Sequence, residues 1–203
     1  MKLLIKISLW ALSLAGIFLL ILPTNWFPSF YDVRYMGICS LIGACIIYFL
    51  PQRLRVAPNI PGADQKNQGV EQLQVLLTCI ILSNALGDLG FYQLYKFGFE
   101  FDKFMHFFNP MLILLLLPIF LQKRFGIRKS YSQVGTFIFA ICIGIFWELF
   151  EFFTDQIFKT HIYGIYGTNI NEDTKWDLLF DLFGSAVGLM ASFFYPRTKT
   201  LYK

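Results

Sequence analysis

The chain has 203 residues, of which 56% are hydrophobic and 15% are charged, whereas ordinary soluble domains carry about 25% charged residues. The formal net charge is +4 and the mean hydropathy is +0.56. A soluble domain of this length buries only about 70% of its unfolded surface, which argues against a soluble enzyme, a disordered chain and a disulfide-stapled secreted domain. We therefore expect an all-α, polytopic integral membrane helical bundle that forms one domain over residues 1–203.

Six apolar stretches approach the roughly 20 residues that a membrane-spanning helix needs. In chain order they cover residues 3–22, 33–50, 70–95, 101–121, 134–153 and 177–195. The first has the lysine-flanked start of a signal peptide, but its apolar run is long for that role, so we interpret it as an uncleaved helix. The third is the least hydrophobic, and an alternative interpretation divides it into two shorter pieces that meet near Gly87.

The positions of the prolines and cysteines agree with the six apolar stretches. Pro51 and five other prolines fall at or beyond the ends of stretches, where a missing backbone donor costs least. Pro110 and Pro118 lie inside the fourth stretch and predict a kink there. The four cysteines all lie in apolar runs without a CxxC pair, which favours small buried hydrophobic side chains over a redox or metal role.

The basic residues predict that both termini lie in the cytoplasm. With six spans, 12 of the 17 lysines and arginines fall on the side of the termini, as the positive-inside rule requires. We interpret them as topology signals, so no nucleic-acid partner is expected. The acidic residues show the reverse pattern, with 11 of 13 on the opposite side. Acidic residues contribute little to topology, so this asymmetry needs a separate explanation.

Polar side chains from successive stretches are expected at one level near the outer face. Asp88 lies late in the third stretch, Asp102 and His106 open the fourth, Glu148 and Glu151 close the fifth before Asp155, and Asp177 and Asp181 open the sixth after Asp173. Their spacings of three, four, seven or eight residues place the groups of each helix on one face. Gly184 and Gly188 continue near the last stripe and would allow close packing on a neighbouring helix. Three helices can therefore offer ligands to one outward-opening pocket.

This residue set suggests a divalent metal site. A carboxylate inside a membrane costs about 2.5–3.5 kcal/mol, and clustered carboxylates repel one another, so protons or cations must neutralise them. Histidine combined with carboxylates suits Zn²⁺, Mn²⁺ or Mg²⁺. The candidate metal ligands are His106, Asp102, Glu148, Asp177 and Asp181. The candidate catalytic acid or base groups are Glu148, Glu151 and Asp102.

A structural interpretation competes with the metal site. Asp102 and Asp177 also fit charges that favour a helix N-terminus, with Lys103 and Lys175 in ordinary ion pairs. His161 lies in an outer loop and is interpreted as a surface residue. Trp147, Trp176 and the many nearby phenylalanines and tyrosines are first an interfacial aromatic belt.

The same segments resemble a known family. The runs Asp102–Phe107 (DKFMHF), Trp147–Glu151 (WELFE) and Gly167–Asp177 resemble the YjdF-like family of small bacterial inner-membrane proteins. The Asp-Lys-x-x-His run and the later Asp … Gly-Ser-x-x-Gly run are also similar to VanZ-like proteins, which are associated with glycopeptide resistance. The resemblance covers roughly residues 75–195. It implies the membrane fold and the location of the site, but no reaction.

Three functions remain open on the sequence. The first is an enzyme of the bacterial inner membrane with a metal-assisted hydrolytic or transfer site that acts on a lipid or lipid-linked envelope substrate beside an apolar groove. The second is a cation- or proton-coupled transporter. The inner halves of the helices argue against it because they lack matching polar residues, and Asn109 is the one deep polar candidate on the fourth stretch. The third is a structural scaffold held by a metal or salt-bridge cluster.

Overall fold

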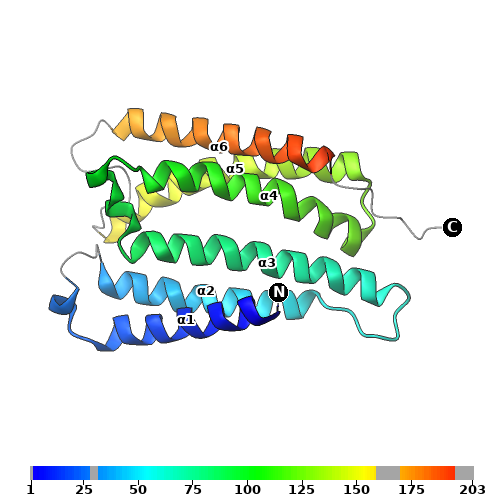
Figure 1. Ribbon diagram of the computed structural model, residues 1–203, viewed down its shortest axis with the longest axis horizontal. Helices are drawn as coiled ribbons and strands as arrows, with labels where there is room; N and C mark the ends of the chain where they lie inside the picture. The colour runs from blue at the N-terminus through cyan, green and yellow to red at the C-terminus, as the bar shows by residue number, and fades with distance from the viewer. Residues whose placement is uncertain (1, 28–31, 159–169, 195–203) are drawn as a thin grey trace.

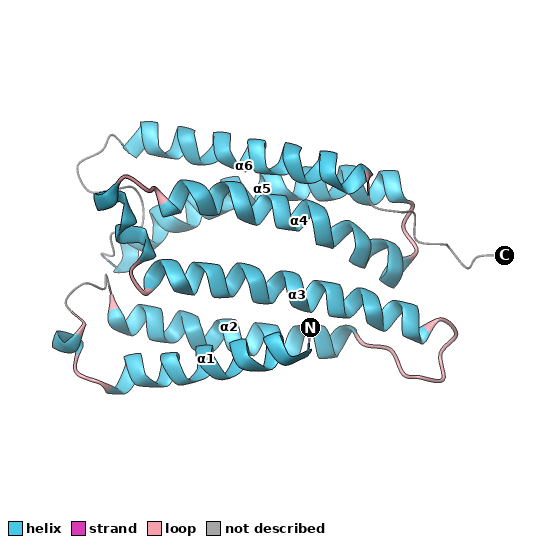
Figure 2. Ribbon diagram, in the orientation of Figure 1, coloured by secondary structure: helices cyan, strands magenta, loops and turns pink. Residues whose placement is uncertain are grey.

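The computed structural model describes the whole chain except residues 1, 28–31, 159–169 and 195–203. The described part is helical, with short turns between helices and no strand (Figure 2). In chain order it holds α1 (Lys2–Ile21), η1 (Thr24–Trp26), α2 (Val33–Leu54), α3 (Ala63–Asp88), η2 (Phe91–Phe97), α4 (Phe101–Phe125), α5 (Lys129–Phe158) and α6 (Ile170–Phe193). The six α-helices are each long and apolar enough to cross a membrane. The all-α polytopic bundle expected from the sequence is confirmed.

The helices lie roughly parallel to one another in a layered bundle (Figure 1). α1 packs on α2 and α3, α3 packs on α4, and α4, α5 and α6 pack on one another. The main buried cluster joins α3 to α4 through residues such as Val70, Leu73 and Leu114. Large apolar side chains on the outside, including Trp10, Phe146 and Phe183, are 60–70% exposed, as expected for helices surrounded by lipid.

The third predicted span differs from the observed helix. α3 begins at Ala63, seven residues before the predicted start, and ends at Asp88 instead of residue 95. The early turns are stabilised because Asn67 both accepts from Val56 N and donates to Val56 O, at 3.0 and 3.1 Å. The helix ends before Gly90, whose φ of +123° lies outside the helical region, and η2 follows it. The break lies close to the Gly87 division considered from the sequence.

Several other helix ends extend beyond the predicted spans. α2 continues through Pro51 to Leu54, although Pro51 was expected at a helix end. A proline at position 51 cannot donate to the carbonyl of Ile47, and the Gln74 side chain on α3 donates to that oxygen instead, at 3.1 Å. α5 and α6 each begin several residues before the predicted starts. α4 is continuous through Pro110 and Pro118.

Glycines allow α6 to pack closely on α4, as the sequence predicted. A β-carbon on Gly184 would lie 2.0 Å from the carbonyl oxygen of Phe107, and one on Gly188 would lie 2.6 Å from that of Met111. Only hydrogen fits at these positions, so the two backbones approach each other directly. This contact fixes the axial position of the first turns of α6 relative to those of α4.

Substituting Gly184 by alanine should therefore destabilise the protein by about 1–3 kcal/mol, because the added methyl group forces α6 away from α4. Thermal unfolding of the detergent-solubilised protein measures the effect. Gly135→Ala on α5 is the control, since a β-carbon there meets nothing within 4 Å and alanine favours a helix. Equal melting temperatures for the two variants would contradict the close contact.

Candidate functional site

Charged side chains from three helices meet at the end of the bundle where α4 and α6 begin. We call this group the acidic cluster; its members are Asp102, Lys103 and His106 of α4, Glu148 of α5, and Asp173, Asp177 and Asp181 of α6. All are buried except Asp102, whose side chain is 28% exposed. The structure thus brings together segments of three helices, of which the first and the last lie more than 60 residues apart in the chain.

Local sequence explains how these side chains come to face one another. Asp102 and His106 are one turn apart on α4, and the three aspartates of the cluster are spaced by four residues on α6, so each set forms one stripe. The start of α4 is fixed by Gly98, with φ of +81°, and by the Phe101 ring, which packs edge-on against Phe91 and Tyr92. The stripes of α4 and α6 then meet where the glycine contacts hold the two helices together.

His106 lies at the centre of the cluster. Its Nε2 atom is 3.9 Å from Asp102 Oδ1, 3.7 Å from Glu148 Oε1 and 3.8 Å from Asp177 Oδ1. These distances are too long for hydrogen bonds. In a tetrahedral site with metal–ligand bonds of about 2.1 Å, ligand atoms lie about 3.4 Å apart, which is close to the observed separations. Ligand atoms of Asp102, His106 and Asp177 all lie within 4.8 Å of one another.

Asp181 contacts the other nitrogen of the His106 ring. Its Oδ1 lies 3.3 Å from His106 Nδ1, on the side of the ring opposite the three oxygens that face Nε2. The carboxylate fits because residue 144 of α5 is glycine: a β-carbon there would lie 2.2 Å from Asp181 Oδ2. Asp181 thus contacts Nδ1 and not Nε2, a position from which a carboxylate can orient the ring; the metal-ligand role expected from the sequence stays a prediction.

Lys103 is the buried cation of the cluster. Its Nζ donates to Asp177 Oδ1 at 2.7 Å and to Asp173 Oδ1, and it lies 3.6 Å from Asp102 Oδ2. The sequence raised Lys103 only as a member of an ordinary ion pair. Its position three residues before His106, on the same helical face, is the signal that could have placed it in the site. Lys175, named with it, is exposed.

Glu148 supplies an unpaired oxygen to the cluster. The residue is 6% exposed, and its Oε1 has no hydrogen-bond partner. Glu148 also interacts with the Thr174 side chain of α6. A buried carboxylate oxygen without a hydrogen-bond partner is costly, so a cation, a proton or a water molecule at this atom would stabilise the cluster.

Two other predicted residues lie apart from this centre. Glu151 is half-buried one turn beyond Glu148 and interacts with the side chain of Trp147; within the described residues it forms no ion pair with His106 or Lys103. Its catalytic role remains a prediction. His161 lies outside the described residues.

A separate apolar pocket lies between α1, α2 and α3. Its volume is about 60 Å³, and its lining includes Leu12, Leu19, Met36 and Asp88. It does not adjoin His106. The groove expected beside the cluster is therefore not this pocket.

The sequence profile of the DUF2238 family, described as "Predicted membrane protein", matches residues 44–198. The chain belongs to the DUF2238 family. The matched region contains every member of the acidic cluster and all of α3 to α6. The description of DUF2238 assigns the membrane but no activity.

An uncharacterized protein of Thermotoga maritima is 31% identical over 113 residues, which are 54% of this chain and 55% of that protein. The chain thus spans about half the length of this curated relative. No solved structure matches the chain.

Proposed function

We propose that this multi-pass membrane protein is a metal-dependent enzyme that hydrolyses or transfers a lipid or lipid-linked substrate of the bacterial envelope. The observation that carries the proposal is the unpaired Oε1 of buried Glu148, 3.7 Å from His106 Nε2. This atom and the oxygens of Asp102 and Asp177 face one nitrogen at similar distances. Such a set of one nitrogen and three oxygens suits Zn²⁺ or Mn²⁺ better than Mg²⁺, because Mg²⁺ prefers oxygen ligands alone.

Charge supports the same proposal. Five carboxylates of the cluster face one lysine and one histidine, so negative charge remains even when both basic side chains are cations. Burial makes that excess costly, and a divalent cation removes most of it. Lys103 holds Asp173 and Asp177 in place beside the metal position.

The residues divide into distinct roles. His106, Asp102 and Asp177 would hold the metal, and Asp181 would hold the His106 ring in its orientation. A bound divalent ion would polarise a carbonyl or phosphoryl group and make a bound water acidic. Glu148 is placed either to complete the ligand set or to accept a proton from the attacking water, as its free oxygen faces the same centre.

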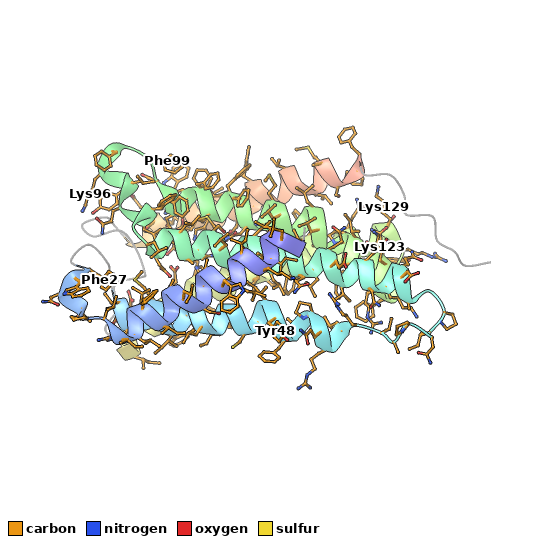
Figure 3. The ribbon with its side chains drawn as sticks, turned by 60° about the horizontal axis from the view of Figure 1, so that its bottom comes forward. Phe27, Tyr48, Lys96, Phe99, Lys123 and Lys129 are labelled. Carbon is orange, nitrogen blue, oxygen red and sulfur yellow. The ribbon has the colours of Figure 1, made fainter. Side chains whose placement is uncertain are left out.

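The location follows from the distribution of basic residues. Lys123 and Lys129 lie at the opposite end of the bundle from Lys96 and Phe99, which are close to the start of α4 (Figure 3). Since the lysine-rich end is expected in the cytoplasm, we propose an inner-membrane protein with both termini inside and the acidic cluster facing outward. An outward site at the membrane boundary is accessible to lipid headgroups and lipid-linked envelope precursors. The YjdF-like and VanZ-like resemblances are compatible with this envelope role.

Metal titration of the purified protein tests the proposal. Adding Zn²⁺ or Mn²⁺ at about 100 times its dissociation constant should stabilise the fold by about 2.7 kcal/mol, which raises the melting temperature by roughly 5–10 °C. EDTA should reverse the change, and Mg²⁺ should have a smaller effect. A melting temperature unaffected by all three ions would reject the metal site.

Asp181→Asn should weaken metal binding without removing a ligand. Loss of the carboxylate at Nδ1 makes the ring less basic and leaves its orientation less fixed, so we expect a 10- to 100-fold higher dissociation constant. Isothermal titration with Zn²⁺ measures it. Asp64→Asn is the control, since Asp64 lies in the first turn of α3, away from the cluster. An unchanged dissociation constant would show that Asp181 does not orient His106.

A structural scaffold is the second candidate, and the buried ion pairs of Lys103 favour it. In that case the lysine is the only cation that the cluster needs. The protein would then have the same melting temperature with and without EDTA. Lipid composition of cells with and without the gene would also be the same.

A further inference from the structure

Polar side chains, all buried except the half-buried Asn109, continue from the acidic cluster toward the opposite end of the bundle. We call them the polar track: Asn109 of α4, Thr136 and Gln133 of α5, and Ser185 and Ser192 of α6. On α6, Ser185 and Ser192 follow Asp181 by four and eleven residues, so the three share one face. On α5, Gln133 precedes Gly144 by eleven residues and lies on the face that Gly144 presents to Asp181.

Contacts at both ends join the α5 members of the track to those of α6. At the cluster end, the Asp181 carboxylate reaches across to Gly144. At the far end, Gln133 Nε2 donates to Ser192 Oγ at 2.8 Å in a buried hydrogen bond. Ala140, which is fully buried, is a small residue of α5 between these two contacts.

Three polar atoms of the track have no hydrogen-bond partner. They are Asn109 Oδ1, Thr136 Oγ1 and Ser185 Oγ. Ser185 is 0% exposed and Thr136 is 1% exposed, so bulk water does not reach them. Buried hydroxyl and amide groups in native proteins are satisfied by protein atoms or by internal water, and these groups lack the protein atoms. We therefore expect the hydrogen-bond partners of these three atoms to be water molecules inside the bundle.

We propose that the polar track is a hydrated path that conducts protons between the acidic cluster and the opposite face of the membrane. Each water or hydroxyl on the path accepts one proton and releases another, so the transfer needs no oxidant, reductant or co-substrate. At one end the path meets the carboxylates, His106 and Lys103 of the cluster. At the other end Lys129 lies beside the residue that follows Ser192, since its Nζ donates to Phe193 O at 3.3 Å.

This placement corrects one expectation from the sequence, which found no matching polar residues in the inner halves of the helices. Single serines and threonines in apolar stretches do not by themselves predict a polar path. The packing of α5 on α6 brings them to one interface. The inference does not require a metal at His106, because the track lies deeper in the bundle than the metal ligands.

Proton flux into liposomes tests the proposal. The full-length protein is reconstituted into vesicles of phosphatidylethanolamine and phosphatidylglycerol that contain a pH-sensitive dye, with EDTA present, and a potassium gradient with valinomycin drives proton entry. Wild-type vesicles should acidify at least threefold faster than protein-free vesicles. The double variant Thr136→Val, Ser185→Ala should acidify at the protein-free rate.

Matched variants separate conduction from folding. Thr136→Ser keeps the hydroxyl and should keep the wild-type rate, whereas Thr136→Val has the same shape without the hydroxyl and should lower the rate at least threefold. Ser8→Ala removes an equally buried and unpaired hydroxyl from α1, away from the track, and should leave the rate unchanged.

Three results would overturn the path: wild-type acidification at the protein-free rate, equal rates for Thr136→Val and Thr136→Ser, or an equal loss in Ser8→Ala. A double variant that does not fold is replaced in the comparison by the Thr136 pair. The metal titration of the purified protein is a separate measurement, so either proposal can fail while the other stands.

Discussion

Replacing Lys103 by methionine is expected to lower the free energy of unfolding by about 3–5 kcal/mol. Methionine fills a similar volume, so the packing of α4 is largely kept while the positive charge is lost. Asp173 and Asp177 would then remain buried without the cation that now contacts both. Removing one partner of a buried ion pair is far more costly than removing the whole pair, because the remaining charge is uncompensated.

Thermal unfolding in detergent, with EDTA present, measures this loss directly. Lys96→Met is the matched control: Lys96 is exposed and its Nζ contacts only the side chain of Gln93, at 3.2 Å, among the hydrogen bonds of the described residues. That substitution should change stability by less than about 0.5 kcal/mol. Similar melting temperatures for the two variants would mean that the Lys103 ion pairs do not stabilise the fold.

The triple variant Lys103→Met, Asp173→Asn, Asp177→Asn extends the test. It removes the three charges together, so most of the lost stability should return.

His106→Ala should raise the dissociation constant for Zn²⁺ or Mn²⁺ at least 100-fold, which corresponds to about 2.7 kcal/mol of binding free energy. The imidazole is the one nitrogen ligand of the proposed set, and Asp102, Glu148 and Asp177 all face its Nε2. Without it, three carboxylates remain with no central group to space them. Elemental analysis of purified protein and isothermal titration measure the loss.

The other histidine of the chain provides the control for this experiment. His161→Ala should leave both metal content and affinity unchanged, since the proposed ligand set is complete without it. Equal metal content in wild type and His106→Ala would show that His106 is not a ligand. A loss in both variants would place the metal elsewhere.

The spanning helices could be predicted because their signal is local. Runs of about 20 apolar residues are visible without knowledge of neighbours, and all six were found. Their ends were less predictable, because several depend on contacts from other helices. Gln74 of α3 satisfies the carbonyl that Pro51 leaves free, and this allows α2 to continue. Such compensation between helices cannot be recognised in a window of sequence.

Most members of the site, with the exception of Lys103, were predictable for a similar reason. Stripes at helical spacing place Asp102 with His106, and Asp177 with Asp181, and the structure brings both stripes together with Glu148. Their relative roles were not predictable. The pairing of each His106 nitrogen with a carboxylate depends on the axial position of α6 along α4. The contact of Gly184 with the Phe107 carbonyl sets that position.

Lys103 and Asp173 are 70 residues apart in the chain, and this separation affects how the protein is made. At a synthesis rate of about 5–20 residues per second, the lysine leaves the ribosome several seconds before its partner. During that interval Asp102 of the same helix is the one carboxylate of the acidic cluster on α4 beside Lys103 and His106. We therefore expect the nascent helix to remain near the water-filled translocon or the lipid headgroups until α6 emerges, so α4 reaches its final environment only after α6 has been synthesised.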